Sequence, residues 1–261
     1  MLATGAVRPP RAVCFELAAA AAVAGAPAVR AAGADIGDVV SLLDALLTDN
    51  DVLRRAAAAP AFGPQFYDAA GDLLGVFVEA AGGGGGAGDG LEATAFRALD
   101  VCTTLQQHSQ QATAAVLSAP RLLSAVAQLL LQDAPCLARR CHYMAVTLLH
   151  SVLESAAFAA AAAGKLHAAC AASGAPIVPA LPAALRRFTR AALPFGPGDT
   201  LVHRVAGAHS CIVLLRTMAF EDEGARSALL REAAECPELL PALVQAIDPP
   251  APRPAPWVAA T

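Results

Sequence analysis

The feature that most constrains the fold of this chain is a short apolar segment that recurs after a glycine or a proline. Five copies begin at Gly37, Gly71, Pro120, Gly164 and Pro237, and each has a leucine or valine two residues later. Proline suits the first turn of a helix because its missing N–H would have no partner there. Glycine suits the tight turn that leads into a helix. We therefore interpret the five segments as helices that begin at these residues.

The spacing of the five segments predicts an array of stacked helices. They begin 34, 49, 44 and 73 residues apart, and helical arrays of one common class repeat every 40–47 residues, roughly. The spacing of 49 contains the glycine-rich stretch 82–90, which we interpret as a loop. The spacing of 73 contains a proline-rich stretch at about 172–200, which we interpret as an insert. The alternative is an irregular all-α bundle, because a chain rich in alanine and leucine yields similar segments by chance.

Three longer segments show helical periodicity and complete the predicted unit. Ala93–Gln107, Ala138–Glu154 and Val205–Ala219 each keep one face apolar, as expected of amphipathic helices. Each is followed by a polar turn, a short helix and one of the five segments, and Glu221–Ala233 is the clearest of the short helices. The pattern predicts three helices per unit and no sheet, since the alternation typical of strands is missing from the sequence.

Three stretches of this pattern resemble the armadillo-repeat family. They are PAVRAAGADIGDVVSLLDALL (27–47), HSQQATAAVLSAPRLLSAVAQLLLQ (108–132) and DEGARSALLREAAECPELLPALVQAI (222–247). The resemblance implies a right-handed α-solenoid of three-helix repeats over residues 1–248, in which the third helix of each unit lines a concave face. Family members of the importin-α type place Asn, and often Trp, on these inner helices. Here the one Asn is Asn50 and the one Trp is Trp257, which argues against a groove that reads nuclear-import signals.

Composition narrows the classes of partner. The net charge of −4 argues against a broad phosphate-binding surface, so no nucleic acid is expected. The chain is 56% hydrophobic, but alanine supplies much of this, and the uncharged stretch Leu166–Leu185 contains three prolines. We therefore expect no membrane span. Five prolines make 249–261 a predicted flexible tail.

The cysteines and the N-terminal residues indicate in which cellular compartment the protein is expected. Seven cysteines lie among apolar residues, and this odd number without a compact framework favours reduced thiols in an intracellular protein, most simply a cytoplasmic one. Residues 1–30 are rich in alanine and carry Arg8, Arg11 and Arg30. Two interpretations remain open for them, a targeting peptide or the first helices of the array.

No residue pattern predicts a reaction. Cys136, Cys141, His142 and His150 approach a metal-binding pattern, but zinc sites usually match one close pair with a second pair, which is missing. His108–Ser109 and His209–Ser210 stand outside any G-x-S-x-G motif. The glycine-rich stretch is not followed by the Gly-Lys-Ser/Thr of a nucleotide-binding loop. We therefore predict no catalytic, cofactor-binding or metal-binding residue.

The leading hypothesis is a non-enzymatic scaffold that binds a protein or peptide on the concave face of the array. The alternatives are a helical enzyme or small-ligand-binding bundle with its site near the 172–200 insert, and a fragment of a longer array. The predicted partner-binding residues are the polar positions of the recurring helices and a small arginine cluster on the insert: Ser41, Asp44, Glu79, Ser124, Gln128, Lys165, Gln245, Arg186, Arg187 and Arg190.

Overall fold

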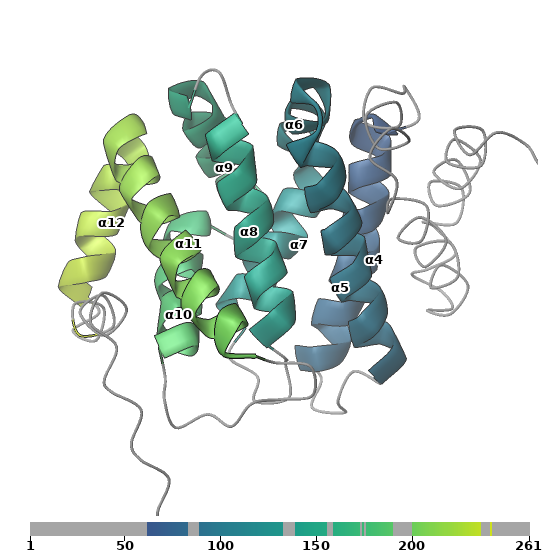
Figure 1. Cartoon of the computed structure of the whole chain (residues 1–261). Helices are drawn as coiled ribbons and strands as arrows, with labels where there is room; N and C mark the ends of the chain where they lie inside the picture. Colours follow the sequence, from purple (N-terminus) through teal and green to yellow (C-terminus); the bar gives the residue numbers. More distant parts are fainter. Residues whose placement is uncertain are drawn as a thin grey trace, which may run out of the picture.

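The computed structural model describes residues 62–82, 89–132, 139–155, 159–172, 174, 176–189, 200–235 and 241. In these ranges every regular element is an α-helix and no strand occurs, which confirms the predicted all-α class. The helices are labelled in Figure 1: α4 (Pro64–Gly82), α5 (Asp89–Gln107), α6 (Gln110–Leu117), α7 (Pro120–Leu131), α8 (Arg139–Ser155), α9 (Ala159–Ala172), α10 (Ile177–Thr189), α11 (Leu201–Glu221) and α12 (Glu223–Glu235).

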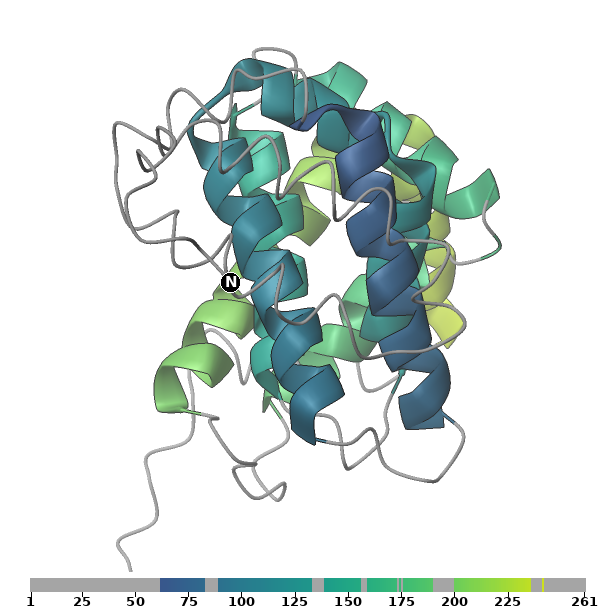
Figure 2. The same ribbon diagram turned by 90° about the vertical axis from the view of Figure 1, so that its right-hand side faces the viewer.

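The helices pack in two layers, and each helix of a layer lies beside the helix three positions later in the chain. One layer contains α4, α7 and α10, and the other contains α5, α8 and α11. In Figure 1 the chain advances from α4 and α5 on the right to α11 and α12 on the left. Figure 2, turned by 90°, shows α4 and α5 side by side at the end of their layers. Helices α6 and α9 contact helices of both layers.

The three long helices are confirmed by the structure, and their apolar faces form most of one layer. On α8, for example, the buried stripe consists of Cys141, Ala145, Leu148, Leu149 and Val152, all fully buried. Such a stripe follows from the spacing of three and four residues that puts side chains on one helical face. Each fully buried leucine or valine contributes roughly 1.5–3 kcal/mol to the free energy of folding.

Helix α7 begins at Pro120, as the sequence predicts. The segment before it is itself a helix, α6, because Ser109 caps it: the Ser109 hydroxyl accepts hydrogen bonds from the backbone N–H groups of Gln111 and Ala112. Serine is a preferred capping residue since it satisfies N–H groups that have no partner within the helix. The order long helix, short helix, third helix is therefore present in α5, α6 and α7.

The prediction that Gly71 begins a helix is wrong, because α4 runs from Pro64 to Gly82 and Gly71 lies in its interior. A Cβ atom at this position would come within 2.6 Å of the Cα atom of Leu122. The glycine is thus explained by the close approach of two helices and not by a turn. Helix α4 ends at Gly82 and α5 begins at Asp89, with residues 83–88 of the predicted loop outside the described residues.

The prediction of an insert at 172–200 is wrong for Ile177–Thr189, which forms α10 and packs between α7 and α11. Its buried side chains include Ile177, Leu181, Leu185 and Phe188. This apolar face stabilises the helix although Pro182 lies inside it, where a proline removes one backbone hydrogen bond. The burial of this apolar face therefore outweighs the tendency of the prolines to interrupt a helix.

Because Ile177–Thr189 is a core helix, the assignment of the third helix in the repeat unit after α7 also changes. Gly164 lies inside α9, so it does not begin a third helix of the kind that Pro120 begins. That place belongs to α10, which packs against α7 as α7 packs against α4. The segment at Gly37, residues 1–30, the tail 249–261 and all of the Pro237 segment except Pro241 lie outside the described residues.

Among the described residues, no single helix is both long enough and apolar enough to cross a membrane. Two consecutive pairs, α6 with α7 and α9 with α10, reach that length and apolarity only when they are taken together, and they are bent by 74° and 94°.

Candidate functional site: the groove between α4 and α7

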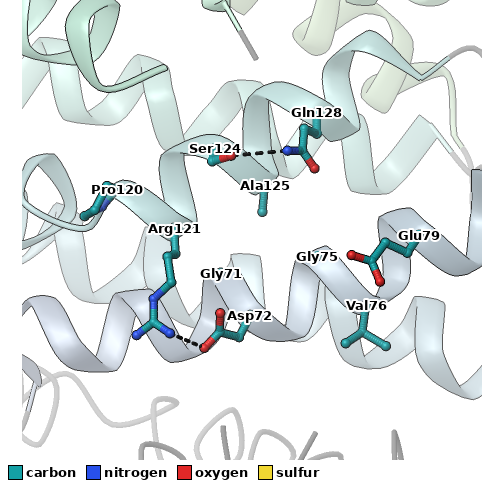
Figure 3. Close-up of a pocket in the computed structure, with 10 residues that line it drawn as sticks. All are labelled: Gly71, Asp72, Gly75, Val76, Glu79, Pro120, Arg121, Ser124, Ala125 and Gln128. Atoms are coloured by element: carbon teal, nitrogen blue, oxygen red, sulfur yellow. Dashed lines mark hydrogen bonds and ion pairs between the residues drawn. The ribbon is translucent and has the colours of Figure 1, made fainter. Parts of the chain in front are cut away.

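A groove of about 470 Å³ runs along the surface between α4 and α7. Figure 3 shows its lining, which comes in equal parts from the two helices. The lining residues are Gly71, Asp72, Gly75, Val76 and Glu79 from α4, and Pro120, Arg121, Ser124, Ala125 and Gln128 from α7.

Two glycines one turn apart on α4 determine the shape of the groove. At Gly71 the backbones of α4 and α7 are in direct contact, and no side chain fits between them. At Gly75 a Cβ atom would meet nothing within 4 Å. The helices are therefore in tight contact at one end and leave an open floor four residues further along α4.

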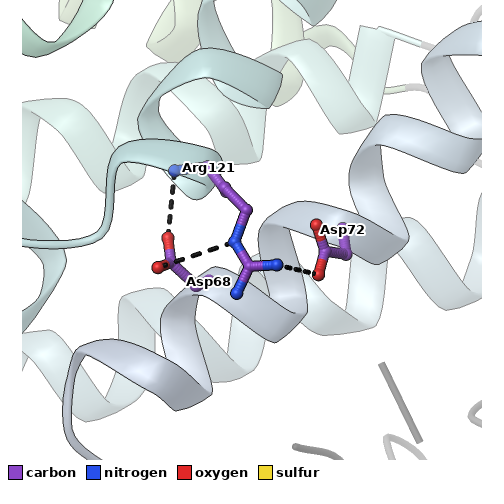
Figure 4. Close-up of polar contacts among 3 residues, drawn as sticks. All are labelled: Asp68, Asp72 and Arg121. Carbon is purple, nitrogen blue, oxygen red and sulfur yellow. Dashed lines mark hydrogen bonds and ion pairs between the residues drawn. The ribbon is translucent and has the colours of Figure 1, made fainter. Parts of the chain in front are cut away.

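An ion-pair cluster occupies the end of the groove near Gly71 (Figure 4). Arg121 Nη1 lies 2.6 Å from Asp72 Oδ2, and Arg121 Nε lies 3.6 Å from Asp68 Oδ2. The Arg121 side chain is 52% exposed, whereas that of Asp72 is 4% exposed. A buried carboxylate needs a charged partner, so Arg121 serves to neutralise Asp72.

Asp68 also caps α7 from a different helix. The backbone N–H of Arg121 donates a 2.9 Å hydrogen bond to Asp68 Oδ1. Ala119, at the position that usually supplies the cap, provides no side-chain hydrogen bond. The carboxylate thus satisfies an N–H group without a helical partner, at the end of the helix where the dipole favours negative charge.

The other end of the groove carries hydrogen-bond acceptors. Glu79 is exposed, and no hydrogen bond or ion pair joins it to the part of the chain that the structure describes. Gln128 Nε2 donates to Ser124 Oγ at 3.3 Å, which leaves the amide oxygen of Gln128 as an acceptor. Gly75 and Ala125 lie between the two polar ends, and Val76 lies beside Glu79 (Figure 3). The groove is therefore polar at its ends and small or apolar in the middle.

The structure brings together three of the predicted partner-binding residues, Glu79, Ser124 and Gln128, in this groove. Lys165 is exposed but lies on α9, because the register that placed Gly164 at a helix start was wrong. Arg186 is half-buried on α10, outside the groove lining. Ser41, Asp44, Arg190 and Gln245 lie outside the described residues.

For Arg187 the predicted surface role is wrong. Arg187 is only 4% exposed, because the face of α10 that carries it packs into the protein core beside Phe188. The sequence prediction treated the arginines as one exposed cluster, and the helical rotation of 100° between adjacent residues separates them.

Sequence reasoning missed four of the residues that shape the site: Gly71 as a contact residue, Asp72, Gly75 and Arg121. One signal was present in the sequence. Gly71 and Gly75 are four residues apart, as are Asp68 and Asp72, so each pair shares one face of a helix. The partner of each pair is on α7, about 50 residues away in sequence, and only the packing of the two helices identifies it.

A second polar cluster joins α8 to α11. Ser210 Oγ lies 3.4 Å from His150 Nδ1, and His150 Nε2 lies 3.2 Å from Glu154 Oε1. These residue types occur in nucleophilic triads, which also need N–H donors for the oxyanion. Ser210 is in the middle of α11, where backbone N–H groups are engaged in the helix. The cluster is therefore a polar contact between two helices.

Cys141 and His142, two of the residues that approach a metal-binding pattern, contact backbone carbonyl groups in the structure. Cys141 Sγ lies 3.9 Å from the Glu92 carbonyl oxygen, and His142 Nε2 lies 3.2 Å from the Gln132 carbonyl oxygen. Within the described ranges, no three His, Cys, Asp or Glu side chains are grouped so that they could hold a metal ion. Cys136 lies outside these ranges.

No protein-family model, no curated protein and no solved structure matches this chain. The groove between α4 and α7 is thus characterised by its own geometry and chemistry.

Proposed function

We propose that this protein is a non-enzymatic scaffold, an α-solenoid of armadillo-like three-helix units that holds an extended segment of a partner protein in the α4–α7 groove. The stacking of α4, α7 and α10, each three helices after the last, supports the solenoid. In such an array the third helices form one continuous surface. The groove lies on this surface, and three polar residues expected from the sequence, Glu79, Ser124 and Gln128, line it.

The observation that carries the proposal is Gly75. A glycine inside a helix destabilises it by about 1 kcal/mol relative to alanine. At Gly71 the close contact with α7 explains the glycine, whereas a Cβ atom at Gly75 would meet no atom of the described residues within 4 Å. The packing of the described helices therefore gives no reason for a missing side chain at Gly75. A ligand that approaches the helix backbone does give one, since glycine permits such an approach.

The alternative function, a helical enzyme or ligand-binding bundle with its site near 172–200, has less support. The described part of that segment, α10, contributes its apolar face to the core and lies outside the groove lining.

The experiment is a comparative capture of partners by the full chain and two variants. Gly75→Leu fills the groove, and Ala168→Leu adds the same side chain to an exposed position of α9. We expect proteins captured by the wild type and by Ala168→Leu to be lost with Gly75→Leu, while circular dichroism shows equal helical content. Captured proteins that bind all three forms equally would contradict the groove as the binding site.

A further inference from the structure

We propose that the outer face of α11 is a dimer interface, on which α11 of a second copy of this chain packs in the antiparallel direction. The apolar part of this face consists of exposed or half-buried side chains: Val202, Val205, Ile212, Val213 and Phe220. The inference goes beyond the scaffold function and does not depend on it, because α11 lies outside the groove lining.

The large apolar side chains of this face are exposed although other helices pack on α11. Helices α8, α9, α10 and α12 all contact it, yet Val202 is 66% exposed, Val205 57% and Phe220 71%. The other exposed large apolar side chains of the described residues, Leu131 and Leu230, lie on α7 and α12. Soluble monomers rarely leave a large apolar patch open, and such patches mark interaction surfaces. The concentration of exposed apolar groups on α11 therefore indicates a docking face.

The spacing of the side chains determines the geometry of this face. Residues follow one another along it at intervals of three and four, at Val202, Val205, His209, Ile212 and Arg216. This spacing brings side chains to one side of a helix, and two helices with such faces pack along their lengths at a shallow angle. Helix α11 has 21 residues and is therefore about 32 Å long. The face thus suits another helix of similar length.

The order of side chains along the face selects a second copy as the occupant, because it is nearly the same in both directions. His209 and Arg216 divide the face into three apolar parts, one at each end and one in the middle. An antiparallel copy therefore places apolar groups on apolar groups and brings His209 beside Arg216. An imidazole nitrogen accepts a hydrogen bond from a guanidinium group. Such reciprocal contacts are those of a two-fold symmetric dimer, the commonest kind of oligomer.

Charge favours the antiparallel direction over the parallel one. The exposed Glu221 lies at the C-terminal end of α11, and Arg204 lies near the N-terminal end. Arg204 Nε donates a 3.3 Å hydrogen bond to the carbonyl oxygen of Phe188, which holds the guanidinium at that end. Antiparallel packing puts the Glu221 carboxylate of one copy near Arg204 and the positive end of the helix dipole of the other. Parallel packing would put like charges together.

The first test is the mass of the full chain in solution, measured by sedimentation equilibrium from about 1 to 100 µM. A single helix face is smaller than the standard interface of about 800 Å² per partner, so we expect a dimer that dissociates at micromolar concentrations. Phe220→Asp should raise the dissociation constant at least about tenfold, since aromatic side chains carry much of the binding energy at interfaces. A wild-type chain that is still a monomer at about 100 µM would overturn the proposal.

Leu230→Asp is the matched control, because Leu230 is 67% exposed but lies on α12. It should leave the dissociation constant unchanged. Circular dichroism of both variants should match the wild type, since exposed positions contribute little to stability, and a lost dimer would then not reflect unfolding. Equal weakening by Phe220→Asp and Leu230→Asp would contradict α11 as the interface.

Cysteine cross-linking tests the direction of the pairing. Val202→Cys and Phe220→Cys chains, mixed and oxidised, should form a disulfide between the two positions, whereas neither variant alone should link to itself through its new thiol. Mass spectrometry of the linked peptides distinguishes these bonds from any that involve the native cysteines, and the oxidised wild type is the control. Self-linked dimers of Val202→Cys alone would show parallel packing and overturn the antiparallel assignment.

Discussion

Gly71 of α4 lies directly against the backbone of Leu122 in α7, so close that a Cβ atom on Gly71 would be 2.6 Å from Leu122 Cα. This contact holds the two helices together beside the Asp68, Asp72 and Arg121 cluster. One turn along α4 the same helices are separated enough to leave the groove above Gly75. The groove is thus a direct consequence of where α4 and α7 touch.

Alanine at these two glycines should have opposite effects on stability. Gly71→Ala inserts a methyl group where backbone atoms lie too close to move aside, and overpacking of this kind typically lowers the free energy of unfolding by about 1–3 kcal/mol. Gly75→Ala meets open space and should raise it by about 0.5–1 kcal/mol, because alanine favours the helix. Urea unfolding measures both. A destabilising effect of Gly75→Ala would mean that the position is crowded.

Leu123→Asp should be far more damaging than Gln128→Ala. Leu123 is fully buried in α7, and a carboxylate without a partner at such a site costs several kcal/mol. Gln128 is exposed, so its replacement should change stability by less than about 0.5 kcal/mol. Thermal melting of the two variants checks this. Equal losses in melting temperature would mean that α7 faces the opposite way.

Asp68→Ala should remove the cap of α7 and lower the free energy of unfolding by about 1 kcal/mol, the typical loss when a capping side chain is deleted. The effect arises because the Arg121 N–H loses its acceptor. Asp68→Asn keeps an oxygen at the same place and should retain most of the stability. Chemical denaturation of both variants provides the measurement, and equal losses would show that charge, and not the cap, is the important contribution.

Leu181→Asp tests whether α10 belongs to the core. Leu181 is 1% exposed, and α10 packs on both α7 and α11. We expect a loss of several kcal/mol, comparable to that of Leu123→Asp. Ala183→Asp, at a half-buried position of the same helix, is the control and should be much milder. If both variants melt like the wild type, the segment is a peripheral insert after all.

Alkaline pH should destabilise the fold through its buried thiols. Burial raises the pKa of Cys170 from 9.0 to about 12, and burial also raises the pKa values of Cys102 and Cys211. Between about pH 9 and pH 12 the buried thiol of Cys170 keeps its proton in the folded protein, whereas the same thiol in the unfolded chain has lost it. The stabilisation is therefore complete below about pH 9 and declines as the pH rises toward 12. Unfolding free energies measured from pH 7 to 11 should fall above pH 9.

The same thiols should resist alkylation. At pH 8 the folded protein should leave Cys102, Cys170 and Cys211 unmodified by iodoacetamide, because thiolates are the reactive form, and urea should expose all three. Mass spectrometry identifies the modified positions. Rapid labelling of Cys170 in the folded state would contradict its burial.

The amino-acid sequence by itself determined the helical class and the long helices of this protein. The apolar stripe of α8, from Cys141 to Val152, is visible in the sequence because side chains three and four residues apart share a helix face. Pro120 likewise marks the start of α7, since proline is compatible with a first turn. Of the groove lining, Glu79, Ser124 and Gln128 could be proposed because they are the polar positions of otherwise apolar helices.

Only the tertiary structure determined the roles of Gly71 and Gly75, and only it showed that the proline-rich segment forms the core helix α10. A glycine in a sequence is compatible with a turn, a close contact or an open surface, and the neighbouring helix determines which applies. The prolines disfavour a helix at α10, but burial of Ile177, Leu181 and Phe188 as α10 packs against α7 and α11 outweighs this local tendency. The pairing of Asp72 with Arg121 also depends on packing, because no local rule links residues 49 positions apart.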